Sequence, residues 1–450
     1  MTHNLTVGNP AKLIFKFAIP LLIGNLFQQL YVMVDAFMVG RIIGVNALAS
    51  VGSIGSINFL ILGFILGVCN GLGILIAQKY GAGDMVAMRR SVATGAVVGV
   101  TVAIMLSLVS APFSRSILEL MQTPREIIDG ANDYLMVLLW GLMISMLFNL
   151  LGNIIRALGD SKTPLYFLAI SSVLNIITNY IFIVIIGTGL AGVALGTLIS
   201  QFASVVMCLI YIHKKLPILR LNREDWQVVW SDIKEHIKVA IPMGFQLSVI
   251  AIGAIIVQFV LNGLGSVAVA ANTAAGRIDQ LAVMPIISFG ATMSTYSAQN
   301  YGAGKIDRIK KGVFQCCIIT LLFCIVMGVI IFFSGYYLSG LFLGEGEYEV
   351  QRLSQVFLRI NGVMYYSLAV MIIFRFTLQG MGHSFIPMIS GFGELVMRIF
   401  AAALLVGPLG FVGVCLSNPL AWLGALIPLA IAYPLTMRRL SKDARVPVQQ

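Results

Sequence analysis

Twelve long apolar runs follow one another along the 450-residue chain, each bounded by glycine, proline or charged residues. A run of about 20 apolar residues can cross a bilayer as a helix. The alternating segments of about ten residues that a membrane β-barrel requires are not seen. The pattern predicts an all-α integral membrane protein with helical spans at 13–39, 47–77, 92–113, 132–155, 164–187, 190–212, 238–262, 267–298, 313–334, 355–380, 386–407 and 411–435.

Composition and charge support this interpretation. Hydrophobic residues make up 59% of the chain and charged residues 10%, whereas soluble domains carry about 25% charged residues. A soluble enzyme is therefore excluded. The net charge of +11 would suggest nucleic acid only if the basic residues clustered on a solvated domain. Most of them instead fall on the membrane side that carries both termini, which predicts cytoplasmic termini in a cell-membrane protein.

The chain also repeats itself. Ala18-Ile19-Pro20 recurs as Ala240-Ile241-Pro242, and Gln78-Lys79-Tyr80-Gly81-Ala82-Gly83 recurs as Gln299-Asn300-Tyr301-Gly302-Ala303-Gly304. Two six-helix lobes of equal orientation follow, related by a pseudo-twofold axis along the membrane normal. We expect an N-terminus at 1–12, an N-lobe at 13–218, a linker at 219–237, a C-lobe at 238–435 and a basic tail at 436–450.

The linker between the lobes carries a helical pattern of its own. Trp226, Trp230, Ile233 and Ile237 recur at helical spacing among polar residues. This pattern predicts an amphipathic helix on the cytoplasmic membrane surface.

Four features together resemble one transporter family: the Ile-Pro pair early in each half, the repeated Gln-x-Tyr-Gly-Ala-Gly, the turn from Arg156 to Pro164, and the pair Asn175-x-x-x-Asn179. Through them the chain resembles the multidrug and toxic compound extrusion (MATE) family over roughly residues 10–435. The resemblance implies a two-lobed exporter with twelve helices. Such proteins exchange an inward cation gradient for organic, often cationic, substrates.

One acidic residue stands out within the first span. Asp35 has no basic residue within one helical turn, and an ionised side chain in a span costs about 2.5–3.5 kcal/mol on insertion scales. It must be either protonated or bound to a cation. Asn175, Asn179 and Thr197 lie at a similar depth, given the helical rise of about 1.5 Å per residue, and supply oxygen atoms suited to Na⁺ or a shared proton. These positions resemble the N-lobe cation site of MATE proteins; the alternative is an aspartate hydrogen-bonded for packing.

The second half carries a different set of charges: Arg277, Asp279, Glu394 and Arg398. Glu394 and Arg398 are four residues apart and predict an ion pair on one helix face. The set is either a second titratable site that contacts cationic substrate or a neutralised structural network. Some MATE proteins carry a carboxylate in helix 7. Residues 244–261 contain none, which favours coupling through Asp35.

Substrate contacts are less sharply indicated. Aromatic, methionine and amide side chains can repack around varied apolar cations. For any single one of them, a lipid-facing or packed position is the simpler explanation. The candidate contact residues are Gln28, Gln29, Tyr31, Gln246 and Met284.

The leading hypothesis is a secondary active multidrug efflux antiporter that works by alternating access. It would export amphipathic organic compounds, often cationic, in exchange for H⁺ or Na⁺, as a monomer in the bilayer, without a cofactor and without catalysis. The sequence does not choose between the two ions. One alternative is a lipid-linked oligosaccharide flippase of related fold, which would need cavity cations such as Arg277, Arg375 and Arg398. Another is an intramembrane transferase, which would need an acidic metal motif that is not seen.

Overall fold

The computed structural model describes residues 4–341 and 347–443, and over these ranges it is helical, without strands. Within these ranges, eleven helices are long and apolar enough to cross a membrane. The pair Ile128–Trp140 and Leu142–Ala157, bent by 52°, supplies a twelfth span if it is counted as one. The predicted all-α membrane fold with twelve spans is confirmed. Residues 444–450 of the expected tail lie outside the described residues.

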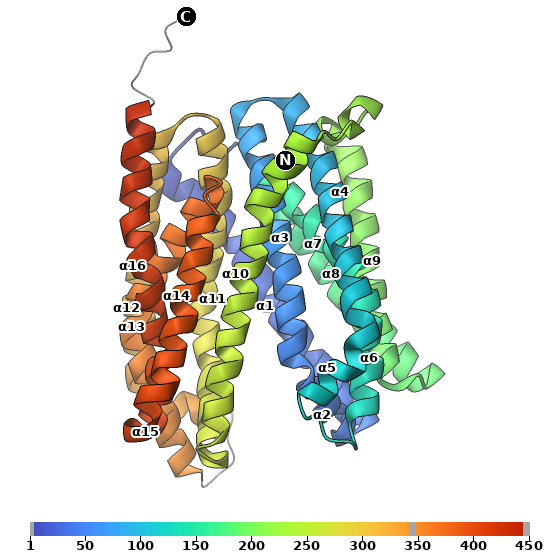
Figure 1. Ribbon diagram of the computed structural model, residues 1–450, viewed down its shortest axis with the longest axis vertical. Helices are drawn as coiled ribbons and strands as arrows, with labels where there is room; N and C mark the ends of the chain where they lie inside the picture. The colour runs from blue at the N-terminus through green and yellow to red at the C-terminus, as the bar shows by residue number, and fades with distance from the viewer. Residues whose placement is uncertain (1–3, 342–346, 444–450) are drawn as a thin grey trace, which may run out of the picture. The chain divides into compact units, whose positions relative to one another are not determined.

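The first half of the chain contains nine α-helices (Figure 1). Two π-helical segments, Val39–Ile43 and Ile181–Ile186, directly follow α1 and α8. Single 3₁₀ turns occur at Ala111–Phe113, Pro217–Leu219 and Arg223–Trp226. The α-helices are α1 Pro10–Met38, α2 Val45–Ser53, α3 Gly55–Ala82, α4 Met85–Ser110, α5 Ser114–Leu120, α6 Ile128–Trp140, α7 Leu142–Ala157, α8 Lys162–Tyr180 and α9 Gly189–Lys215.

The second half repeats the succession of long helices, with fewer interruptions between helical segments. A third π-helical segment, Ala401–Leu405, follows α14 as Ile181–Ile186 follows α8. The α-helices are α10 Trp230–Asn262, α11 Ser266–Gly302, α12 Ile306–Gly340, α13 Tyr348–Gly380, α14 Phe385–Phe400, α15 Val406–Leu409 and α16 Phe411–Asp443.

The described residues divide into two compact units. Unit 1 holds Asn4 and residues 19–244, and unit 2 holds residues 5–18, 245–341 and 347–443. The start of α1 therefore belongs to unit 2, and the start of α10 belongs to unit 1. Pro20 and Pro242 lie inside these two helices, close to the points of division.

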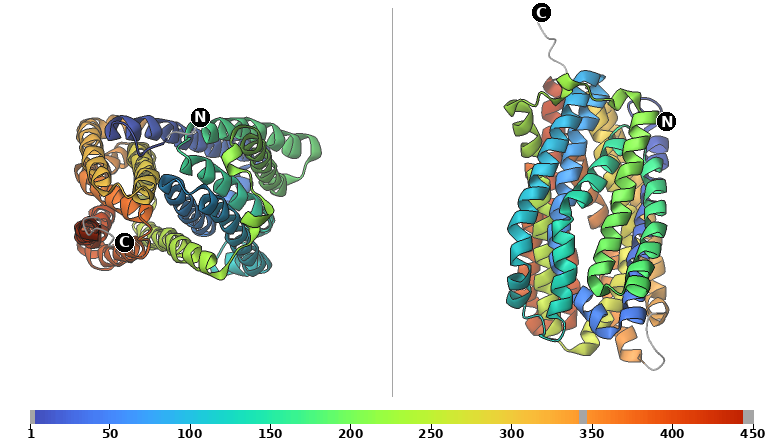
Figure 2. Two further views of the ribbon diagram at one scale, coloured as in Figure 1. Left: turned by 90° about the horizontal axis from the view of Figure 1, so that it is seen from above. Right: turned by 90° about the vertical axis from the view of Figure 1, so that its right-hand side faces the viewer.

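Within each unit the long helices run side by side (Figure 1) and are seen nearly end-on in the left view of Figure 2. In unit 1, α3 packs on α4 and α7, and α8 packs on α9; in unit 2, α13 packs on α11, α12 and α16. Glycine permits the closest approaches: a Cβ on Gly71 of α3 would lie 2.5 Å from the Cα of Ala240 in α10. Small residues at helix contacts are typical of packing in lipid.

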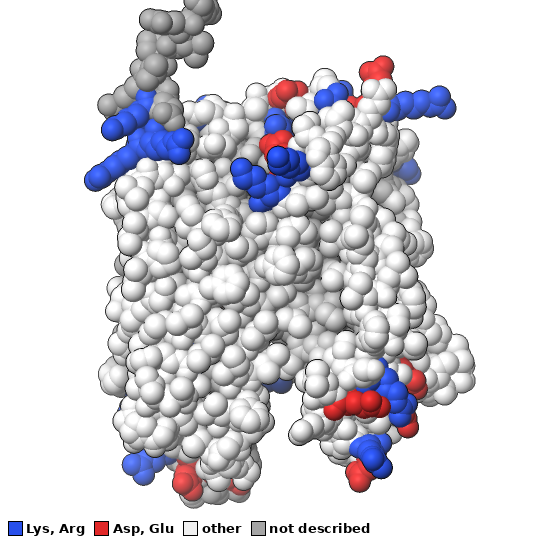
Figure 3. All heavy atoms as spheres, in the orientation of Figure 1, with Lys and Arg blue, Asp and Glu red and all other residues white. Residues whose placement is uncertain are grey.

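On the face shown in Figure 3, charged side chains lie near the helix ends, and the broad middle is made of other residues. This distribution is expected of helices whose middle sections lie in hydrocarbon.

The predicted linker helix at 219–237 is wrong as a separate element. Residues Arg223–Trp226 form one 3₁₀ turn, and α10 begins at Trp230 and continues without a break into its span. The Trp226 and Trp230 side chains are exposed by 51% and 73%. The tryptophan spacing therefore marks the outer face of a turn and of a span's first residues.

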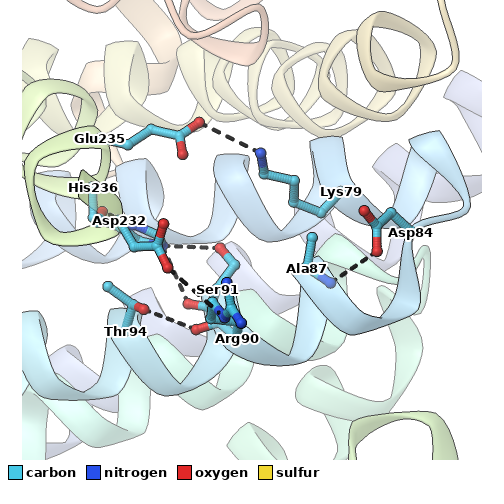
Figure 4. Close-up of polar contacts among 9 residues, drawn as sticks. All are labelled: Lys79, Asp84, Ala87, Arg90, Ser91, Thr94, Asp232, Glu235 and His236. Atoms are coloured by element: carbon cyan, nitrogen blue, oxygen red, sulfur yellow. Dashed lines mark hydrogen bonds and ion pairs between the residues drawn. The ribbon is translucent and has the colours of Figure 1, made fainter. Parts of the chain in front are cut away.

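Polar contacts explain why α10 starts so early (Figure 4). His236 is buried, and its Nε2 lies 2.9 Å from the Ser91 hydroxyl of α4. Glu235 pairs with Lys79 of α3 at 3.7 Å, and Asp232 pairs with Arg90 of α4 at 4.0 Å. These contacts hold the first turns of α10 against α3 and α4, so the helix extends past the apolar run.

Candidate functional site

Asp35 lies near the end of α1 and receives a hydrogen bond from α8. Asn179 Nδ2 donates to Asp35 Oδ1 at 2.8 Å. The same nitrogen donates to Asn175 Oδ1 at 3.1 Å, so both of its N–H groups are used. The two asparagines are fully buried, and Asp35 is partly buried. The i, i+4 spacing of the asparagines thus builds a ladder that ends on the carboxylate.

The ladder continues to α9. Asn175 Nδ2 donates to Thr197 Oγ1 at 3.4 Å, and the Tyr31 hydroxyl donates to the same oxygen at 3.2 Å. Thr197 in turn donates to the backbone oxygen of Val193 at 3.1 Å. The structure thus brings together Asp35, Asn175, Asn179 and Thr197, the four residues that the sequence singled out for cation coupling. Tyr31, expected among substrate contacts, joins this cluster instead.

The cluster still has an oxygen that can accept a hydrogen bond, but few N–H or O–H groups that remain free to donate one. Asn179 Oδ1 is buried without a hydrogen-bond partner, and Asp35 forms no ion pair with a described residue. A buried acceptor without a partner costs about 1–3 kcal/mol. A proton on Asp35 or a small hard cation beside these oxygens would relieve that cost.

Local backbone features hold the cluster close. The π-helical segments Val39–Ile43 and Ile181–Ile186 begin four and two residues after Asp35 and Asn179, and they contact each other. On α9, a Cβ at Gly196 would clash with Asn179 Oδ1. Single π turns inside helices are frequent at functional sites. Here they end α1 and α8 just beyond the cluster, and Gly196 makes room for the amide.

In unit 2 the charged residues are arranged differently from the expected network. Glu394 pairs with Arg375 of α13, and Arg398 Nη2 lies 4.0 Å from Glu394 Oε2, so the predicted Glu394–Arg398 pair is present. Arg375, a candidate cavity cation in the flippase alternative, is instead a partner of Glu394. Arg277 is exposed and forms no ion pair with a described residue. The expected set of two acids and two bases is corrected to one acid between two arginines.

Asp279 stands apart from this triad. Its Oδ1 accepts a hydrogen bond from the Tyr365 hydroxyl of α13 at 2.7 Å. No bond to Glu394 is present among the described residues, because both Glu394 oxygens face arginines. Asp279 is therefore a second span carboxylate whose described partner is a neutral group.

The remaining candidates for substrate contact are scattered. Gln246 is buried and accepts from Gln379 Nε2 at 2.7 Å. Met284 is buried at 6% exposure. Gln28 is exposed and Gln29 half-buried on α1. These residues do not form a cluster comparable to the one around Asp35.

Comparison with known proteins now decides the family. The MatE family model matches the chain twice, once in each half, over residues 20–181 and 242–404. The chain belongs to the MatE family. The double match follows the internal repeat and confirms the resemblance drawn from the motifs.

Relatives of this MatE protein cover most of its length. The probable multidrug resistance protein YpnP of Bacillus subtilis (strain 168) is 29% identical over 77% of each chain. The probable multidrug resistance protein NorM of Thermotoga maritima is 24% identical over 92% of this chain and 89% of its own. A crystal structure of MATE in complex with MaL6 superposes with a TM-score of 0.89 at 22% identity, over 98% of this chain and 99% of the other. That structural likeness concerns the fold.

The sequence did not predict three features of this MatE protein: the contact of Tyr365 with Asp279, the contact of Arg375 with Glu394, and the role of Gly196 beside Asn179. Tyr365 and Arg375 bond acids on other helices, and no local spacing links such residues. Gly196 carried a usable signal: Gly192 and Gly196 form a small-xxx-small pair one residue before Thr197. Such a pair indicates close helix packing, and α9 does pack on α8 there.

Proposed function

We propose that this protein is a secondary active multidrug efflux antiporter that exchanges H⁺ or Na⁺ for organic, often cationic, compounds. Its relatives named multidrug resistance proteins support the efflux role. We further propose that it works as a monomer in the cell membrane with both termini in the cytoplasm. The basic residues near the terminal side support that orientation through the positive-inside rule.

One observation carries the coupling proposal: Asp35 is a carboxylate in a membrane span that accepts a hydrogen bond from the neutral amide of Asn179 and forms no ion pair with a described residue. Without a proton or a cation, such a carboxylate is costly in the membrane. An ion arriving at Asp35 changes the charge of the whole ladder. The ion then favours whichever arrangement of the protein binds it more tightly, and a ligand shifts a conformational equilibrium only by that difference in affinity.

The arrangement also suggests which ion-binding atoms are used. Asp35 supplies the charge, and Asn179 Oδ1 supplies a buried oxygen that has no other partner. For a proton, Asp35 alone is sufficient. For Na⁺, several oxygen ligands are needed. The amide oxygen of Asn175 and the hydroxyl oxygen of Thr197, which belong to the same ladder, are the further candidate ligands.

The test is efflux of a fluorescent organic cation from proteoliposomes, with a pH gradient and a sodium gradient imposed separately. We expect one of the two gradients to drive transport in the wild-type protein and neither to drive it in Asp35→Asn. Asp84→Asn is the matched control. Asp84 caps α4 through Ala87 N at 2.9 Å, and asparagine serves equally well as a helix cap.

Two results would contradict the proposal. Transport that ignores both gradients in the wild type would rule out antiport with these ions. Undiminished gradient-driven efflux in Asp35→Asn, at equal protein level, would remove Asp35 from the coupling step.

The flippase alternative is less well supported. It needs free cations to hold a pyrophosphate, and two of the three candidate arginines are engaged. Arg375 and Arg398 both face Glu394, and Arg398 also donates to the backbone oxygen of Ile250 at 3.1 Å.

A further inference from the structure

A basic pocket lies at the end of α16 in unit 2, far along the chain from the Asp35 cluster. It is an open surface depression of about 410 Å³ between the last turns of α16 and the second turn of α12. Lys310, Arg438 and Lys442 contribute three cations, and Tyr433 and Met437 form an apolar wall. Ser441 also lines the pocket, but its hydroxyl donates to the backbone oxygen of Met437 at 2.8 Å. Nothing in the proposed transport cycle uses this pocket.

The wall of the pocket is well packed. The Tyr433 ring stacks on Phe374 of α13, with ring centroids 4.6 Å apart and an angle of 13° between the planes. Met437 is 4% exposed. Lys310 Nζ donates to Ser441 Oγ at 2.6 Å, which ties α12 to α16 across the pocket. This packing therefore fixes the helix turns that carry the three cations.

Positive charge dominates the pocket. Lys310 also pairs with Asp307 at 3.2 Å, but the Asp307 side chain is 96% exposed and does not line the pocket. An ammonium has three N–H donors, so Lys310 keeps one for a ligand. Arg438 and Lys442 form no ion pair with a described residue. The site thus offers several donors and a net positive charge to an anion such as a phosphate group.

The surface that continues from the pocket indicates where the phosphate comes from. Both α12 and α16 are membrane spans, so their ends lie at the depth of lipid headgroups. On the face of α16 that carries Arg438, the next turns present Leu435, Ile431 and Ile427, exposed by 58%, 59% and 62%. On α12, Phe314 follows Lys310 by one turn and is 67% exposed.

We propose that this pocket binds the phosphate headgroup of an anionic phospholipid, whose acyl chains lie along the exposed apolar faces of α12 and α16. A free phosphate ion would use the cations alone. A lipid uses both the cations and the apolar faces, and basic pockets between membrane helices are known places for anionic headgroups.

The test is binding of phosphatidylglycerol to the purified full-length protein in neutral detergent, followed by native mass spectrometry. The pocket variant is Lys310→Gln/Arg438→Gln. The matched control is Lys311→Gln/Arg439→Gln, which removes the same charge from the neighbouring exposed residues that do not line the pocket. We expect the pocket variant to bind one phosphatidylglycerol at least about tenfold more weakly and the control to stay within about twofold of the wild type.

Parallel titrations identify the source of the phosphate. Phosphatidylcholine, glycerol 3-phosphate and inorganic phosphate should each bind the wild type far more weakly than phosphatidylglycerol. Equal loss in the two double variants, equal binding of phosphatidylcholine, or full competition by a soluble phosphate at matched concentration would overturn the proposal. Should the pocket variant fail to fold, Lys442→Gln removes one exposed cation, and we expect it to weaken phosphatidylglycerol binding by about threefold or more.

Discussion

Asn179 Nδ2 donates to Asp35 Oδ1 at 2.8 Å, which joins α8 to the carboxylate of α1. The amide also donates to Asn175, so Asn179 is the branch point of the ladder. Its own Oδ1 has no partner and is fully buried. The residue therefore both orients Asp35 and leaves an acceptor beside it.

The first prediction removes this branch point. Asn179→Ala should lower the initial rate of gradient-driven efflux by about tenfold, because a hydrogen bond to a charged group contributes about 1.5–3 kcal/mol. Rates are measured in proteoliposomes at equal protein content. Asn262→Ala, at the exposed end of α10, is the control and should transport normally. An equal loss in both variants would argue that the asparagine in α8 has no special role.

The second prediction concerns the space beside Asn179. Gly196→Ala places a methyl group against Asn179 Oδ1, and overpacking of this kind costs about 1–3 kcal/mol. We expect efflux to fall sharply while the protein still folds in the membrane. Gly52→Ala adds the same methyl group in α2 where nothing lies within 4 Å. Its efflux and thermal stability should match the wild type; if Gly196→Ala also matches, the clash is relieved by a harmless movement of the amide.

Much of this site could be predicted from the sequence because it depends on depth and on local spacing. The Asn175–Asn179 ladder follows from an i, i+4 spacing, and the meeting with Asp35 follows from counting helical rise toward the same membrane side. The fold was equally accessible, since long apolar runs leave helices as the only alternative to a barrel.

Contacts between distant helices could not be predicted in this way. The partner of Glu394 across helices is Arg375 and the partner of Asp279 is Tyr365, each on α13. A single sequence does not show which faces of two helices meet. The linker prediction was wrong for a related reason. The tryptophan spacing fits an amphipathic helix, but α10 is extended by the buried contact of His236 with α4 and by more exposed ion pairs of Glu235 with α3 and Asp232 with α4.

The third prediction separates a structural acid from a titratable one in unit 2. Glu394→Gln leaves Arg375 and Arg398, both less than a tenth exposed, without a counter-charge. Breaking a buried pair in this way costs about 3–5 kcal/mol. Asp279→Asn keeps an oxygen that can accept from Tyr365, so its stability should change by less than about 1 kcal/mol. Thermal unfolding in detergent compares the two; equal destabilisation would contradict the distinction.

The last prediction tests the bond that holds the start of α10. His236 Nδ1 lies 2.7 Å from the backbone oxygen of Asp232, which can only accept, so Nδ1 donates there and Nε2 faces the Ser91 hydroxyl. His236→Leu and Ser91→Ala each leave a buried polar partner unsatisfied and should cost about 1–3 kcal/mol.

The double variant removes both polar groups, so its loss of stability should be smaller than the two single losses added together, by at least about 0.5 kcal/mol. Denaturant unfolding in mixed micelles gives the four values that this cycle needs. Strict additivity would mean that the two side chains do not interact, and the early start of α10 would then depend on the ion pairs of Glu235 and Asp232 alone.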